Sequence, residues 1–133
     1  MTENRGLTIA TYLSLVPGVF LLISGLLILL APDAAAVLFD ISDADSFKEP
    51  LSLAMGIRQV AIGLMITTLV FSNQLQALGI ILIVGALVPL ADFFLFGPTN
   101  GWTSALRHAG PIPLILGLGI YLLLQTRGGS TKK

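Results

Sequence analysis

Long apolar stretches alternate with short polar segments along the chain. Four of these stretches lie at residues 9–31, 51–72, 75–97 and 105–125. Each approaches the length of about 20 mostly apolar residues that a helix needs to cross the hydrocarbon core of a bilayer. The pattern therefore predicts an all-α fold, a polytopic membrane four-helix bundle formed by one domain over residues 1–133.

The first stretch follows a short polar leader, so a cleavable secretory signal is the alternative interpretation, with Ala34–Ala36 imitating a cleavage site. Residues 9–31 contain no charge and exceed the apolar core of an ordinary signal peptide. The leader also carries one acid against one base, Glu3 and Arg5. We interpret the segment as a retained span.

The polar connections between the stretches differ in character. Residues 32–50 are acidic and include an apolar run, which favours a loop with a short helix on the membrane surface. Residues 72–74 and 97–101 have turn composition, the second followed by Trp102, an aromatic placed as an interface anchor. The Gly/Ser/Lys-rich tail, residues 127–133, is expected to be disordered.

Basic residues predict the orientation of the chain. With four spans both termini lie on one side, which then holds Arg5, Arg127, Lys132 and Lys133, against Lys48 and Arg107 on the other. Loops rich in Lys and Arg stay on the cytoplasmic side. We therefore expect a multi-pass protein with cytoplasmic N- and C-termini.

Composition narrows the function. Charged residues make up 11% of the chain, the net charge is zero and the mean hydropathy is +0.93. The expected partner is thus the lipid bilayer, and the absence of a basic stripe argues against nucleic acid. The chain has no cysteine and one histidine, which excludes thiolate chemistry and the usual zinc and iron–sulfur sites. We expect no metal and no cofactor.

Small residues recur seven positions apart within the stretches, close to two helical turns, so each pair shares one helix face. Such residues let neighbouring membrane helices approach closely. They predict packing faces at the following pairs: Gly18/Gly25, Gly56/Gly63, Gly79/Ala86 and Gly110/Gly117.

Three ionisable residues fall within or beside the stretches. Counting from a turn near residue 73, Arg58 lies about 15 residues before and Asp92 about 19 after, so at 1.5 Å per residue their heights differ by about 6 Å. His108 opens the last stretch on the same side. Charges inside a span usually face the bundle interior with a partner. We therefore expect one cluster, beside a kink where Pro89 leaves the Gly85 carbonyl without a donor.

This cluster is the candidate catalytic site for a lipophilic small metabolite. His108 can exchange a proton near neutral pH, while Arg58 holds Asp92 ionised or orients an oxyanion. Such groups suit an isomerisation, a cyclisation or an oxidation, as found in secondary metabolism. The residues expected to contact the bound molecule are Ser24, Gln59 and Trp102.

The same residues are also compatible with two other functions. The Arg58–Asp92 pair can be a structural ion pair in a non-enzymatic accessory protein, which works through a membrane partner or a homo-oligomer. A small-solute or proton transporter is a further alternative. The transporter is disfavoured because polar residues do not continue through the membrane depth. With an accessory role also open, the residues do not decide whether the chain is an enzyme.

The motifs themselves resemble a known family. Ala54–Gln59 with Gly63, then Pro89–Asp92, then His108–Gly110 resemble an uncharacterised family, labelled as a domain of unknown function, of small four-helix membrane proteins from fungi and bacteria. The resemblance implies the four-span fold and marks Gly56 together with the three ionisable residues. A fainter similarity is to anthrone-oxygenase-type membrane proteins, small four-span chains that act on polyketides. It implies only that such a scaffold can host catalysis.

Overall fold

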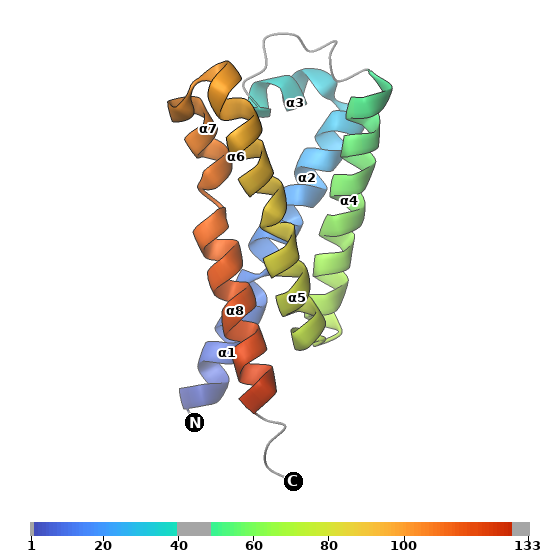
Figure 1. Ribbon diagram of the computed structural model, residues 1–133. Coiled ribbons are helices and arrows are strands. Elements are labelled where there is room, and N and C mark those ends of the chain that lie inside the picture. Colours follow the sequence, from blue (N-terminus) through green and yellow to red (C-terminus); the bar gives the residue numbers. More distant parts are fainter. Residues whose placement is uncertain (1, 40–48, 129–133) are drawn as a thin grey trace. The chain divides into compact units, whose positions relative to one another are not determined.

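The computed structural model describes residues 2–39 and 49–128, and these residues form helices joined by short breaks (Figure 1). The described part contains no strand, which confirms the predicted all-α class. The helices in chain order are α1 (Thr2–Leu13), α2 (Leu15–Leu30), α3 (Pro32–Phe39), α4 (Pro50–Phe71), α5 (Leu75–Gly85), α6 (Leu87–Asn100), α7 (Trp102–Ala109) and α8 (Ile112–Gly128).

Three helical segments among the described residues are long and apolar enough to cross a bilayer. They are Arg5–Leu30, Pro50–Phe71 and Leu75–Leu95, with hydropathies of 2.6, 1.7 and 2.5. A fourth apolar segment, Ile112–Arg127, is shorter. Most side chains of the three long segments face outward, with only 22–28% of each window buried. Such outward apolar faces are stable in lipid and unstable in water, so the chain has the character of a membrane protein.

The chain divides into two compact units, which are described separately. The α2–α4 unit comprises residues 15–68, and the terminal unit comprises residues 1–14 and 69–133. The boundary at Ser14 coincides with the break between α1 and α2, where Pro17 cannot donate a hydrogen bond to the carbonyl of Leu13.

Glycines bring α2 and α4 together within the α2–α4 unit. A Cβ atom on Gly25 would lie 2.7 Å from the carbonyl oxygen of Gly56, and one on Gly63 would lie 2.7 Å from that of Gly18. The two helices are therefore antiparallel and in backbone contact at two levels. The predicted packing faces at Gly18/Gly25 and Gly56/Gly63 are confirmed. The short helix α3 packs on α2 through Ala35 and Ala36, against Ile28.

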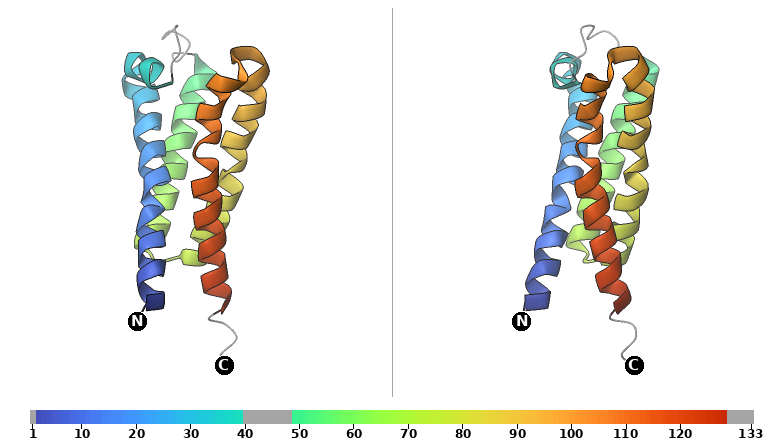
Figure 2. Two further views of the ribbon diagram at one scale, coloured as in Figure 1. Left: turned by 90° about the vertical axis from the view of Figure 1, so that its left-hand side faces the viewer. Right: turned by 60° about the vertical axis from the view of Figure 1, so that its left-hand side comes forward.

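The terminal unit uses a different glycine pair from the predicted one. A Cβ on Gly79 of α5 would lie 3.0 Å from the carbonyl oxygen of Gly119 of α8, and the reverse distance is 2.9 Å. Gly117, which the seven-residue spacing selects, has nothing within 4 Å. The predicted packing face at Gly110/Gly117 was therefore wrong. Gly110 precedes α8, so the two glycines do not share one continuous helix, and α8 contacts α5 through Gly119. In Figures 1 and 2, α1 begins and α8 ends at the same end of this unit.

Prolines also break two further stretches that were predicted as spans. The helix over residues 75–97 is interrupted at Ala86, one turn before Pro89, as the sequence predicts. The stretch at residues 105–125 differs from expectation, since it is split into α7 and α8 around Pro111. Pro111 and Pro113 both lack an N–H group, so two neighbouring backbone hydrogen bonds to the end of α7 are lost and the helix breaks there. Pro113 then lies in the first turn of α8, where a missing N–H group costs little.

Of the two predicted turns, one is confirmed and the other differs in extent. Residues 72–74 form the expected tight turn, with Asn73 in the left-handed conformation at φ 53°. The predicted turn over residues 97–101 is wrong in extent: α6 continues through Pro98 to Asn100, and the chain leaves the helix at Gly101, where φ is 85°. The middle of the acidic loop, residues 40–48, and the tail residues 129–133 lie outside the described residues.

Candidate functional site

Two of the three predicted ionisable residues lie on neighbouring helices of the terminal unit. Asp92 is on α6 and His108 on α7, and these helices pack along each other after the reversal at Gly101 (Figure 1). Asp92 is about nine residues before this reversal and His108 about seven after it. At 1.5 Å per residue, their backbones therefore lie within about 3 Å of the same height.

Asp92 is half-buried and belongs to the apolar segment Leu75–Leu95. An acid inside a membrane helix costs about 2.5–3.5 kcal/mol on insertion scales unless a partner or a polar cavity compensates. For His108 the structure gives the helix but not the side chain. The α6–α7 pair thus places an acid and a histidine position at about the same height.

Trp102 begins α7 and packs back on α6. Its ring centroid lies 5.4 Å from that of Phe93, with the planes tilted by 52°, and its six-membered ring covers Gly97. The outer part of the indole stays open, since 54% of the residue is exposed. The predicted substrate-contacting role of Trp102 is untested, and its structural role is to fix α7 against α6.

Gly97→Ala should displace Trp102, because a Cβ at this position would run into the indole ring. We expect a loss of about 1–3 kcal/mol in unfolding free energy, typical of overpacking, and a shift in the tryptophan emission. The chain has one tryptophan, so fluorescence in detergent reports on this contact alone. Gly85→Ala is the matched control, since nothing lies within 4 Å of its added Cβ. Equal emission and stability in the two variants would contradict the packing described.

Arg58, the third predicted residue, lies on α4 in the α2–α4 unit, with an exposed side chain. It therefore belongs to a different unit from Asp92 and His108. The three-residue cluster stays a prediction, because it depends on how the two units meet.

Ser24 and Gln59, which are predicted to contact a bound molecule, form a hydrogen bond with each other. The Ser24 hydroxyl is fully buried and donates a hydrogen bond of 2.7 Å to Gln59 Oε1, with the carbonyl of Leu21 at 3.2 Å. Gln59 follows Arg58 directly, so the pair fixes the rotation of α4 and with it the direction in which Arg58 leaves the helix. A hydrogen bond between membrane helices contributes about 0.6 kcal/mol on average. Whether either residue binds a ligand is untested.

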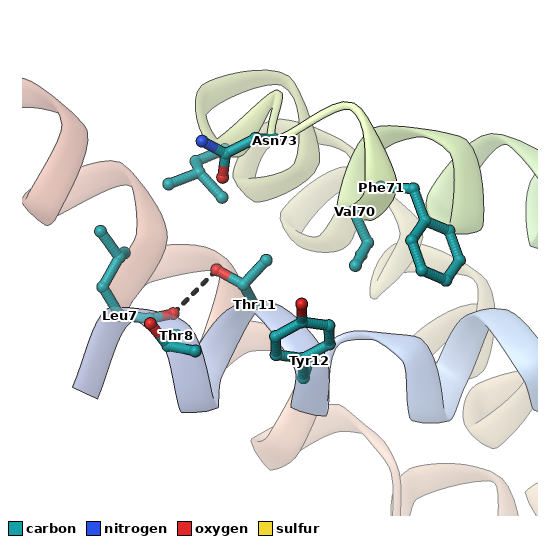
Figure 3. A pocket seen from close by; sticks show the side chains of 8 residues that line it. Leu7, Thr8, Thr11, Tyr12, Val70, Phe71 and Asn73 are labelled. Carbon is teal, nitrogen blue, oxygen red and sulfur yellow. Dashed lines mark hydrogen bonds between the residues drawn. The ribbon is translucent and has the colours of Figure 1, made fainter. Parts of the chain in front are cut away.

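A hollow of about 370 Å³ lies elsewhere in the terminal unit (Figure 3). One wall is formed by α1, through Leu7, Thr8, Thr11 and Tyr12. The other is formed by the end of α4 and the following turn, through Val70, Phe71, Asn73 and Leu75. Asp92 is about 17 residues further along the chain from Leu75, or about 25 Å if helical. The hollow is therefore not part of the predicted acid–base site.

The sequence reasoning missed this hollow. Tyr12 is an exposed aromatic near one end of a span, and Asn73 is the turn residue between two spans. The sequence feature that could have pointed to the hollow is the position of both polar residues near the ends of spans, where lipid headgroups begin. Asn73 lies beside Tyr12 only because α1 packs next to this turn, which the residues around each of them do not determine.

Comparison with known proteins gives a family but no activity. A family described as Domain of unknown function (DUF4267) matches residues 18–122, which is most of the chain and includes all three predicted ionisable residues. No curated protein and no solved structure matches the chain. The fainter similarity to anthrone-oxygenase-type proteins is not shown by these comparisons.

Proposed function

The chain belongs to the DUF4267 family, whose function is unknown, and we propose a function from its own residues. In this proposal the chain is a small multi-pass membrane protein. It binds a lipophilic small molecule and converts it by acid–base chemistry. The observation that carries the proposal is the α6–α7 pair, with Asp92 in an apolar span and His108 at about the same height on the packed helix. An acid in a span is a functional candidate by default.

The proposed chemistry moves a proton without a cofactor. A lipophilic molecule reaches the site from the bilayer and places a carbonyl between the two helices. The Asp92 carboxylate takes a proton from the carbon next to the carbonyl, while the His108 imidazolium donates one to the carbonyl oxygen, giving an enol. Where the enol is conjugated with a C=C bond, Asp92 returns its proton to the far carbon of the conjugated system while the enol hydroxyl gives its proton back to His108. This step completes an isomerisation and restores both groups. Arg58 is the proposed group that stabilises the developing negative charge on oxygen.

The proposed function is tested by comparing lipid-soluble metabolites extracted from cells with and without the protein. One compound should accumulate in cells that lack the protein, and an isomer of equal mass should appear in cells that contain it. If the two extracts are identical under all growth conditions, the enzymatic proposal fails.

A second candidate is a non-enzymatic accessory protein, and the Ser24–Gln59 hydrogen bond favours it. Here two polar residues expected to bind a ligand contribute to helix packing, and Arg58 with Asp92 would do the same. In that role Arg58→Met combined with Asp92→Leu should keep function, because apolar residues of similar size can replace charged residues that serve only in packing. Loss of function in this double variant would contradict the accessory role.

We also propose four spans with both termini in the cytoplasm. The apolar segment Ile112–Arg127 serves as the fourth span, with α7 completing its length on the other side of the proline break. The chain contains no cysteine, so single cysteines can be introduced without background. Cysteines replacing Glu3 and Ser130 should react with a membrane-impermeant maleimide only after the cells are opened, whereas a cysteine replacing Asp43 should react in intact cells. Labelling of the two termini from opposite sides would contradict four spans.

A further inference from the structure

The hollow beside α1 lies at the level of a membrane surface. Asn73 occupies the turn between the candidate spans Pro50–Phe71 and Leu75–Leu95, so it stands where the hydrocarbon core ends. The facing part of α1 belongs to the segment Arg5–Leu30, and Figure 1 shows α1 extending past this turn. A molecule in the hollow would therefore contact both the acyl region and the headgroup region.

The hollow is lined by polar groups that the protein leaves unsatisfied. Within the described residues, neither the Tyr12 hydroxyl nor the Asn73 side-chain amide has a hydrogen-bond partner, and both line the same hollow (Figure 3). The Thr11 hydroxyl donates to the carbonyl of Leu7 at 2.8 Å and keeps its own lone pairs as acceptors. The Tyr12 hydroxyl and the Asn73 amide are neutral donors, so both can donate hydrogen bonds to the carbonyl oxygens of glycerol esters.

The remaining lining is apolar. Phe71 is 72% exposed, Leu75 is partly exposed and Val70 is buried. An acyl chain leaving the hollow toward the membrane would therefore run along an aromatic surface. A volume of about 370 Å³ is at the lower end of small-molecule sites, about 300–1,000 Å³, so the hollow can enclose only part of a lipid.

A positive charge stands one turn further out. Arg5 is three residues before Thr8 and seven before Tyr12, a spacing that places the three side chains on one helix face. Its side chain is exposed and makes no ion pair within the described residues. A guanidinium at headgroup height, above neutral polar groups and an apolar wall, complements a phosphate, an ester and an acyl chain in that order.

We propose that this hollow binds one glycerophospholipid of the surrounding bilayer, with the phosphate at Arg5, the glycerol esters at Tyr12 and Asn73, and the start of one acyl chain along Phe71. The site is distinct from the proposed acid–base site and does not depend on it. It holds a lipid between α1 and the turn that joins α4 to α5.

The first test uses the full-length protein in nanodiscs of phosphatidylcholine. A small fraction of the lipid carries a photoactivatable diazirine near the ester end of one acyl chain. After illumination, crosslinks should concentrate in peptides that contain residues 7–12 and 70–75. Crosslinks spread evenly over the outward faces of the helices would overturn the proposal. This test needs no variant, so it does not depend on the folding of a mutant.

The second test removes the polar groups singly. Tyr12→Phe removes one hydroxyl, and Asn73→Gly removes the amide while keeping a residue that tolerates the left-handed backbone. Each should lower crosslinking about three- to tenfold, the effect of one lost hydrogen bond. Tyr121→Phe is the matched control, since this tyrosine belongs to the same unit but does not line the hollow. Equal crosslinking in Tyr12→Phe and Tyr121→Phe would contradict the assignment.

A third test distinguishes a lipid from a soluble phosphate ester. Arg5→Gln should lower crosslinking of the phospholipid probe but not of a diazirine-labelled diacylglycerol, which has no phosphate. Adding millimolar glycerol 3-phosphate should leave the crosslinking of the phospholipid unchanged. If it competes, the hollow is a site for a water-soluble phosphate ester and the lipid assignment is wrong.

Discussion

Replacing Gly63 by alanine should destabilise the α2–α4 unit by about 1–3 kcal/mol, and by more if the helices cannot separate. The added Cβ would lie 2.7 Å from the carbonyl oxygen of Gly18 and 2.8 Å from the backbone nitrogen of Leu22. Both neighbours are backbone atoms of α2, so no side-chain rotation can relieve the clash. Separation of α2 and α4 would also lengthen the Ser24–Gln59 hydrogen bond.

The matched control for this variant is Gly117→Ala. Gly117 is also a glycine inside an apolar helix, but nothing lies within 4 Å of its added Cβ. Alanine at this position should be neutral or stabilising by about 0.4–1 kcal/mol, because the unfolded chain loses conformational freedom. Unfolding in mixed detergent micelles, followed by circular dichroism, measures both. If Gly63→Ala is no less stable than Gly117→Ala, α2 and α4 are not in backbone contact at this level.

Asp92→Asn should abolish metabolite conversion, with a loss of about 100-fold or more, while the folded protein persists. Asparagine has nearly the shape of aspartate but cannot accept a proton at neutral pH, so it removes the proposed base without opening a cavity. General acid–base catalysis contributes about 10²–10⁴-fold to a rate, which sets the expected size of the effect. Conversion is measured as the ratio of the two isomers in cells that express equal amounts of protein.

Two further variants separate catalysis from folding. His108→Ala should cause a comparable loss of conversion if it supplies the acid. Thr126→Val is the control on the same unit, since its hydroxyl only donates to backbone carbonyls of its own helix, at 3.0 Å to Leu122 and 3.1 Å to Leu123. If Asp92→Asn converts the metabolite as well as the control does, Asp92 is not the base and the accessory role gains support.

The helical, membrane-type character of the chain could be predicted from sequence because it depends on local composition. Runs of apolar residues near 20 in length admit few folds, and Pro89 predicts an interruption of the third apolar stretch because it lacks an N–H group inside the helix. The place of Asn73 in a tight turn follows equally from the residues around it. The family resemblance rested on short motifs of the same local kind, and the match over residues 18–122 confirms it.

The candidate site was predicted less completely, because its residues meet only through packing. The sequence selected Ser24 and Gln59 as ligand contacts from their depth, yet their side chains satisfy each other at 2.7 Å. Asp92 and His108 lie at about the same height on α6 and α7, through a reversal at Gly101 rather than the predicted turn over residues 97–101. The cluster with Arg58 remains a prediction.

The helical character of this protein, the membrane-type length of its apolar segments and the interruption near Pro89 follow from the sequence, since each property depends on residues within a few turns of one another. Which small residues touch follows from the packed fold alone, because that depends on the rotation of each helix about its own axis. Gly119 rather than Gly117 meets Gly79 for this reason. The hollow at Tyr12 and Asn73 exists for the same reason, since residues about 60 positions apart meet only when α1 packs beside the turn.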